Sequence, residues 1–467
     1  MHGIIIMQRS YMSFRRSTME QVSSYSVRIN EYSHVFDKTV NVYRSAVDFF
    51  VSVCLKEWDT IGAVKSSNER CNSVECLTVR TKRRPLVKYD FDRDFHKFPS
   101  YLRRSAIAHA VGSVSSYRSR LKAWKDTPEA ERGRRPGLPK AGFCFPALYK
   151  GNMFVETGKD AAKVKVFIRN TWDWIDVSLR RQDVKYIKSH CQGMKKMSPS
   201  LRRKGKRWYL CFPFTRKATL SDRGTDGHMA ERILSVDLGI TNACTCCVME
   251  KDGTVTSRHF LRLGGENDSL SRALGRVRKA QCGGAKRMPR LWARANCLNR
   301  DISVKTASFI IKKAVENRVD VIVMEHLDLS GRKRGRMKQR LHHWRAKYVQ
   351  AMVTHKAHAL GIRVSTVCAW NTSRLAFDGS GRVLRGRESA KTDGVYSLCE
   401  FTNGKVYNCD LNASYNIGAR YYIREHTKSL PETAGQRLKA EVPSAVKRST
   451  CTLSTLISLY AVLYASA

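Results

Sequence analysis

The spacing of apolar positions divides the chain into a helical part, a strand-rich part and a mixed part. Residues 40–58 and 101–124 repeat apolar side chains at helical spacing, and Pro99 and Ser100 precede the second run, so two long helices are expected. Residues 143–215 instead hold short β-branched and aromatic runs separated by turn residues, a pattern typical of a small β-barrel or sandwich. One earlier strand is expected at residues 25–29.

From residue 233 onward, apolar runs alternate with helical segments. Buried strands are expected at 233–240, 254–263 and 320–327, one more strand at 363–370, and helices at 266–318 and 342–361. Strands that alternate with helices indicate an α/β domain with a partly parallel sheet. The apolar tail is shorter than the roughly 20 residues that cross a bilayer, and one face of it predicts a docked terminal helix: Leu453, Leu456, Ile457, Tyr460, Leu463 and Tyr464.

The net charge of the chain indicates that it is not a generic α/β protein but one that binds a polyanion. The 467 residues include 85 Lys+Arg against 40 Asp+Glu, a formal net charge of +45. Such an excess repels itself unless an anionic partner is present, and DNA or RNA is the natural partner. The basic residues are dispersed, whereas a membrane-surface protein concentrates them on one amphipathic segment. The 15 Cys have no disulfide-type spacing and are read as reduced intracellular thiols.

Three acidic residues are candidates for chemistry. Asp237 and Glu325 end buried strands, and Asp410 lies where a helix is expected to begin. A carboxylate at the end of a buried strand is costly unless it is paired or bound to metal. Two divalent cations about 3.5–4 Å apart would relieve the repulsion among three converging carboxylates and clamp the reacting oxygens of a phosphodiester. Oxygen ligands and phosphate chemistry indicate Mg²⁺, with Mn²⁺ as a substitute.

Each acid also has a structural explanation when it is taken alone. Asp237 could begin a turn, Glu325 could pair with an arginine, and Asp410 could be a helix N-cap.

The residues around these acids resemble a known family. SVDLGITNA (235–243), VIVMEHLDL (321–329) and CDLNASYNIGAR (409–420) are similar to the three RuvC motifs of the TnpB (OrfB) transposon-encoded nucleases and of the compact type V CRISPR effectors descended from them. The segment that runs into Thr372 and Ser373 resembles the same family, and so do 99–117 and the strands through 208–214.

The resemblance implies a fold and a domain order. An α/β, RNase H-like RuvC nuclease domain would follow a β-barrel wedge domain that carries an inserted helical recognition lobe. The expected bounds are 1–40 for the first part of the wedge, 41–140 for the helical lobe, 141–220 for the wedge barrel, 221–425 for the nuclease domain and 426–467 for the tail.

The resemblance also implies RNA-guided DNA cleavage. Asp237, Glu325 and Asp410 would be the catalytic and metal-binding residues, guide RNA and target double-stranded DNA the partners, and the prokaryotic cytoplasm the location, with no membrane. A transposon-encoded nuclease and a CRISPR effector remain open, as does the oligomeric state. The alternatives are a guide-dependent repressor that does not cut and a guide-free, structure-specific nuclease.

The chain departs from the family at its zinc ribbon. Ala376 and Gly379 stand near the positions of the first cysteine pair, and Cys399 is the nearest thiol before Cys409. Because a zinc site needs four N or S ligands, zinc is not expected. The loop at 371–408 is instead expected to be held by Phe377, Tyr396 and Phe401.

Two basic clusters are candidates for nucleic-acid contact. One lies in the second long helix: Arg103, Arg104, Tyr117, Arg118, Arg120 and Lys122. The other follows the second motif, where a solvated loop is the alternative: Arg332, Lys333, Arg334, Arg336, Lys338 and Arg340. Four tryptophans could stack on bases but are expected to pack in cores: Trp124, Trp172, Trp174 and Trp208.

Overall fold

The computed structural model describes residues 18–31, 34–221, 229–239, 242–327, 344–428 and 449–464. The chain separates into two compact units, of which the first includes residues 22–216 and the second residues 217–464. None of the helices in the described ranges combines the length and the hydropathy that a membrane crossing requires.

The first unit holds two long helices, which lie where the apolar spacing predicts them, and shorter helices between them. They are α1 (His34–Lys56), α2 (Trp58–Ala63), α3 (Ser67–Thr78), α4 (Phe91–Asp94) and α5 (Ser100–Asp126). The helix α5 begins at Ser100, directly after Pro99, as expected. A polar contact joins the two long helices, because the hydroxyl of Tyr43 lies 2.9 Å from Ser105 Oγ and 2.7 Å from His109 Nδ1.

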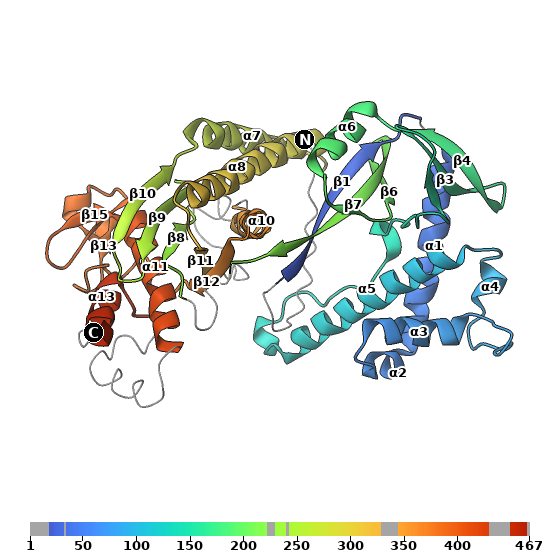
Figure 1. Ribbon diagram of the computed structural model, residues 1–467, viewed down its shortest axis with the longest axis horizontal. Coiled ribbons are helices and arrows are strands. Elements are labelled where there is room, and N and C mark those ends of the chain that lie inside the picture. The colour runs from blue at the N-terminus through green and yellow to red at the C-terminus, as the bar shows by residue number, and fades with distance from the viewer. Residues whose placement is uncertain are drawn as a thin grey trace. The chain divides into compact units, whose positions relative to one another are not determined.

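The strands of the first unit form two sheets (Figure 1). One has the order β1-β7-β5, with β6 also paired to β7, and the other has the order β2-β3-β4. Their bounds are β1 (Thr18–Arg28), β2 (Phe154–Glu156), β3 (Ala161–Ile168), β4 (Thr171–Ser178), β5 (Lys195–Lys196), β6 (Ser200–Lys204) and β7 (Arg207–Thr219). The helix α6 (Arg181–His190) lies inside the part that the sequence indicated as strands. Closure into a barrel stays a prediction.

One hydrophobic core serves both the helices and the strands of this unit. Phe36 and Phe50 of α1 belong to the same buried cluster as Phe154 of β2 and Trp208 of β7. Trp208 is 1% exposed, which confirms core packing for this tryptophan. The helical lobe and the strand-rich part therefore depend on each other for burial, and their separation at about residue 140 stays a prediction.

The second unit is built on a five-stranded sheet of order β10-β9-β8-β11-β12. Its strands are β8 (Arg232–Asp237), β9 (Cys244–Glu250), β10 (Val255–Leu261), β11 (Val321–His326) and β12 (Arg363–Cys368). Strands β8, β11 and β12 are parallel, and β9 and β10 are antiparallel, so the expected mixed α/β sheet is confirmed. Strand β9, CTCCVME, was not predicted.

Helices cover both faces of this sheet (Figure 1). On one face, α11 (Cys409–Lys428) packs on β8, β9, β11 and β12. The crossover helices α8 (Pro289–Glu316) and α10 (Ala346–Ala359) contact the sheet from the other face, and α7 (Gly264–Cys282) packs on α8. Parallel neighbours need such crossovers, since a tight turn cannot return the chain to the same end of the sheet.

The tail helix α13 (Leu453–Tyr464) docks on α11, as predicted. Its buried face differs from the expected one. Leu453, Leu456 and Leu459 enter the core, whereas Ile457 is 51% exposed. The three leucines recur every three residues, and that row lies on the side of the helix turned to α11.

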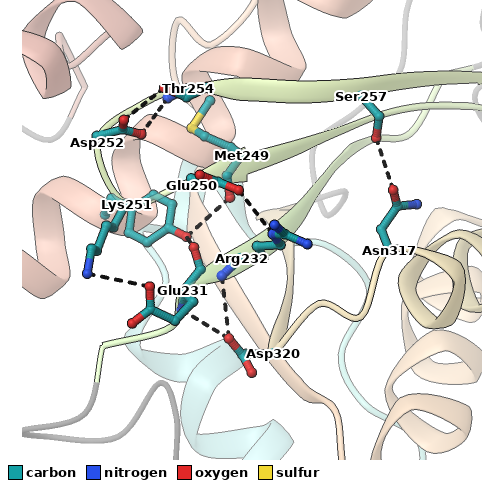
Figure 2. A network of polar contacts seen from close by, with 11 residues as sticks. Glu231, Arg232, Met249, Glu250, Lys251, Asp252, Thr254, Ser257, Asn317 and Asp320 are labelled. Atoms are coloured by element: carbon teal, nitrogen blue, oxygen red, sulfur yellow. Dashed lines mark hydrogen bonds and ion pairs between the residues drawn. The ribbon is translucent and has the colours of Figure 1, made fainter.

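A polar network fixes the end of the sheet where β8 and β11 begin (Figure 2). Asp320 Oδ2 accepts hydrogen bonds from the backbone N–H groups of Glu231 and Arg232, at 3.0 and 3.4 Å. Arg232 Nε in turn lies 3.0 Å from Glu250 Oε1 at the end of β9. These contacts hold the register of the three strands at the end of the sheet opposite Asp237 and Glu325.

The loop at 371–408 folds into a small three-stranded sheet of β13 (Leu384–Arg385), β14 (Leu398–Glu400) and β15 (Val406–Asn408). Phe401 is buried in its core, and the Phe377 ring lies 5.5 Å from the Phe401 ring, as expected. Tyr396 is 67% exposed, yet its ring covers Gly386 so closely that an added Cβ would lie 2.8 Å from it. Gly386 also has a φ of +56°, so only glycine suits this position.

Candidate active site

Strand pairing brings Asp237 and Glu325 together. The parallel ladder of β8 and β11 pairs Val236 with Met324, so the same register continues to Asp237 and Glu325. Side chains alternate between the two faces of a sheet. Ile233 lies four residues before Asp237 and Val323 lies two residues before Glu325, so each shares the face of its strand with the acid. Both residues pack in the core shared with α11. Both carboxylates therefore face α11.

Asp410 reaches the same place from the first turn of α11. Asn408 caps this helix, because its Oδ1 accepts the backbone N–H groups of Asp410 and Leu411, each at 3.0 Å. Asn408, not Asp410, is therefore the N-cap of α11, and capping does not account for the Asp410 carboxylate. Ser235 Oγ of β8 fastens the helix to the sheet by donating to the carbonyl of Ser414 over 2.7 Å.

A close approach of α11 to the sheet also depends on Gly418. An added Cβ at this position would lie 2.9 Å from Met249 Sδ and 3.3 Å from Ser235 Cβ. A larger residue would push α11 away from β8 and β9, and with it Asp410 away from the strand ends.

The three acids act on one another electrostatically. The pKa of Asp237 is raised well above its ordinary value of 3.8, first by burial and then by the negative charges of Glu325 and Asp410. Burial also raises the pKa of Glu325, against the hydrogen bond from Thr372 and the charge of Arg420. Arg420 does not neutralise Glu325 by pairing, because its N–H groups donate to the carbonyls of Cys368, Trp370, Ser449 and Cys451.

Four residues that were not predicted for the site contact or face these acids. Asn242 Nδ2 donates to Asp410 Oδ2 over 2.6 Å, Thr372 Oγ1 donates to Glu325 Oε1, and Gln350 Nε2 donates to the Glu325 carbonyl over 2.7 Å. Asn242 and Thr372 lie inside the quoted motifs, so their position was a signal that could have been used.

The fourth residue, Arg385, comes from the small sheet. Its positive charge lowers the pKa of Asp237, its Nη1 donates to Ser373 Oγ over 3.1 Å, and its buried Nε has no hydrogen-bond partner within the described part of the chain. No feature of the sequence marked it.

The donor chemistry of the three acids fits a hard divalent cation, since all offer carboxylate oxygens and burial disfavours the charged form of Asp237 when no cation is bound. Within the ranges described, no three His, Cys, Asp or Glu side chains are arranged to hold one ion.

The residues at the expected zinc ribbon do not fit zinc. Ala376 occupies a first-pair position and is buried in the small core with Val383, Cys399, Phe401 and Cys409. Two buried thiols in an apolar cluster fall short of four N or S ligands. The absence of zinc stays a prediction.

The predicted nucleic-acid residues of α5 divide into two groups. Arg103 pairs with Glu75 at 3.7 Å and Asp92 at 3.6 Å, Tyr117 is buried, and Arg118 Nη2 donates to the Leu55 carbonyl over 3.3 Å. These three hold the helices of the first unit together. Arg104, Arg120 and Lys122 are exposed. The second cluster lies outside the described residues: Arg332, Lys333, Arg334, Arg336, Lys338 and Arg340.

Comparison with solved structures supports the fold that the motifs implied. A cryo-EM structure of Cas12f1 with its sgRNA and target DNA matches 82% of this chain and 81% of that chain, with a TM-score of 0.51 and 14% identity. The chain shares its fold with Cas12f1. A structure of the mini-RNA-guided endonuclease CRISPR-Cas_phi3 covers 86% of this chain and 92% of that chain, with a TM-score of 0.47 and 12% identity. The resemblance to compact type V effectors is thus confirmed at the level of the fold.

Sequence comparison adds a match to the first unit. The model of the Aq_aa04 family matches residues 23–168. The uncharacterized protein aq_aa04 of Aquifex aeolicus (strain VF5) is 27% identical over 150 residues, which are 29% of this chain and 84% of that protein. This match contains the helices α1 to α5 and names no activity.

Proposed function

We propose that this chain is an RNA-guided DNA endonuclease, which recognises a short flanking DNA motif and cuts at a single RuvC-type site made of Asp237, Glu325 and Asp410. One observation carries the proposal. Three acids from distant parts of the sequence converge at one edge of a sheet, in a fold shared with a protein that was solved with sgRNA and target DNA.

The chemistry follows from the acids and their partners. Two Mg²⁺ ions, or Mn²⁺ in their place, would stabilise the attacking and leaving oxygens of a phosphodiester when bound by these carboxylates. Asn242 orients Asp410, and Thr372 orients Glu325, so that their remaining oxygens face the substrate. Arg385 adds a positive charge beside Asp237, where a phosphate would be placed.

The charge of the chain supports the proposed partners. A net charge of +45 suits a guide–target heteroduplex, which a protein holds through backbone contacts and helical shape rather than through base readout. The exposed Arg104, Arg120 and Lys122 on α5 remain candidates for such contacts, together with the basic cluster at 332–340.

The decisive experiment begins with the RNA that co-purifies with the full chain. Sequencing it identifies the guide, and the flanks of the guide distinguish a transposon setting from a repeat array. The complex is then given a duplex that matches the guide, together with Mg²⁺. We expect cutting that requires both the guide and the match.

Two other outcomes would replace this proposal. A complex that binds the matched duplex but leaves it uncut in Mg²⁺ would indicate a guide-dependent repressor. Cutting that continues after the RNA has been digested away would indicate a guide-free nuclease. A minimal control is the same complex with a duplex that lacks the match.

A further inference from the structure

A cavity of about 80 Å³ lies directly beside the carboxylate edge of the second unit. Leu238 and Gly239, the residues that follow Asp237, form one of its walls. The other walls come from α7, α8 and the start of α10, which cover the face of the sheet opposite α11 (Figure 1). A single water molecule needs roughly 10–15 Å³, so the cavity has room for a planar ring.

The walls of the cavity combine apolar and polar groups. Leu270, Leu274, Ile302 and Val349 provide apolar surface. Ser303 and Thr306, each 2% exposed, lie on the wall that α8 provides. Their hydroxyls donate to the carbonyls of Asn299 and Ile302, both over 2.8 Å, and keep acceptor capacity for a ligand. Flat apolar walls with a few fixed polar groups are suited to an aromatic heterocycle.

The lining of the cavity also includes an aromatic side chain and a cation. Trp344 and Arg345 line it at the start of α10, and both are half-buried. Arg345 Nη2 is held by Asn296 Oδ1 over 3.0 Å. Indole and guanidinium groups are the side chains on which unstacked bases pack in proteins that bind single strands. Leu238 and Gly239, in the cavity wall, directly follow Asp237, so the sugar–phosphate chain of a nucleotide seated here would pass the end of β8.

We propose that this cavity receives one unstacked nucleobase of the DNA strand being cut, from a nucleotide next to the cut bond. The inference rests on the proposed function and deepens it, because it assigns a positioning site for the substrate strand. Seating the base would fix the neighbouring phosphodiester over Asp237, Glu325 and Asp410. Extruding a base from a stack costs energy, which favours single-stranded or already opened DNA as the substrate.

Abasic substitution tests the proposal. The full chain, loaded with its guide, is given matched targets in which one nucleotide at a time around the cut is abasic. Single-turnover cutting rates are measured for the wild type, for Ser271→Phe, whose ring would enter the cavity from the exposed side of α7, and for Ser269→Phe as a matched control on the same helix but away from the cavity. Target affinity is measured for each protein.

We expect one abasic position to slow the wild type by about tenfold or more, the order that one stacked base contributes. Ser271→Phe should slow cutting of the intact strand by a similar factor, with target affinity unchanged. A target that is abasic at the same position should slow this variant little further. Ser269→Phe should behave as the wild type. Thr306→Val, which removes a polar atom from the wall while nearly keeping its shape, gives a second measurement if Ser271→Phe folds poorly, and it should also slow cutting of the intact strand.

Two results would contradict the proposed base-binding pocket without contradicting the proposed nuclease activity. One is wild-type cutting that is equally fast at every abasic position. The other is a result in which the factor by which Ser271→Phe or Thr306→Val slows cutting multiplies the factor by which the abasic nucleotide slows it. By contrast, a wild-type complex that never cuts the intact strand overturns the proposed function and this inference together.

Discussion

Asn242 and Asp410 are joined by a hydrogen bond of 2.6 Å, from the side-chain amide to the carboxylate. The bond ties the segment after β8 to the first turn of α11, so it fixes one acid of the site relative to the strand that carries another. Asn242 is 6% exposed, so water does not readily replace this partner.

Asn242→Ala should therefore lower the cutting rate by about 10- to 100-fold, the range for residues that orient metal ligands. The reason is that Asp410 loses its orientation while the acid itself remains. Single-turnover cutting across a series of Mg²⁺ concentrations measures the effect, and a partial rescue at high Mg²⁺ is expected. An unchanged rate at low Mg²⁺ would show that this contact does not support the site.

Asp237→Ala, Glu325→Ala and Asp410→Ala should each abolish cutting, a loss on the order of a thousandfold or more, because each removes a proposed ligand. Guide and target binding should be retained and are measured in parallel. Glu250→Gln is the control, since it alters an acid at the far end of β9, in the network of Figure 2. Near-normal cutting by any one of the three alanine variants would remove that residue from the site.

The stability of the metal-free protein should depend on Asp237. The folded chain holds the proton of this acid more tightly than the unfolded chain, in which the pKa is near 3.8. Stability is therefore lost as the pH rises from about 3.8 through the raised pKa of Asp237. Asp237→Asn lacks this loss, so its melting temperature should exceed that of the wild type by an amount that grows with pH.

Thermal unfolding in a chelator, between about pH 4 and pH 8, measures this difference. Excess Mg²⁺ should stabilise the wild type more than Asp237→Asn, because the ion binds the charged acid. A difference in melting temperature that stays constant over this range would mean that burial and like charge do not raise the pKa of Asp237.

Arg385→Ala should lower cutting by about a hundredfold, the order for loss of one preorganised donor in a reacting site. Arg385→Lys should recover only part of the rate, because an ammonium keeps the charge but loses the planar fork. Arg387→Ala, an exposed neighbour, is the matched control. If Arg385→Ala cuts as fast as Arg387→Ala, the guanidinium beside Asp237 has no part in the reaction.

Elemental analysis of the purified protein should find no stoichiometric zinc. The small sheet at 371–408 has an apolar core of Ala376, Val383, Cys399, Phe401 and Cys409 in the place of a four-ligand site. Its melting temperature should accordingly be insensitive to a zinc chelator. One zinc per chain would contradict this prediction.

Much of the second unit followed from the order of residues along the chain. Apolar runs predicted β8 and β11, because a strand buried on both faces needs apolar side chains in sequence. The run at β12 was also predicted as a strand, although most of its side chains are only half-buried. The motifs around Asp237, Glu325 and Asp410 marked the three acids, since their residue types recur in a known family. The sequence patterns missed β9, which is rich in cysteines, and α6, which lies within a strand-rich stretch.

The rest was decided by tertiary structure. The register of β8 against β11 places Asp237 next to Glu325, and Asn408 rather than Asp410 caps α11. Asn242, Thr372 and Arg385 join the site only because strands and loops that are distant in sequence meet at one edge of the sheet. The sequence by itself identified which acids are the candidates for the chemistry, because their neighbours carry that signal. Only the fold decided which side chains surround them, because burial and hydrogen bonding act between residues that are far apart along the chain.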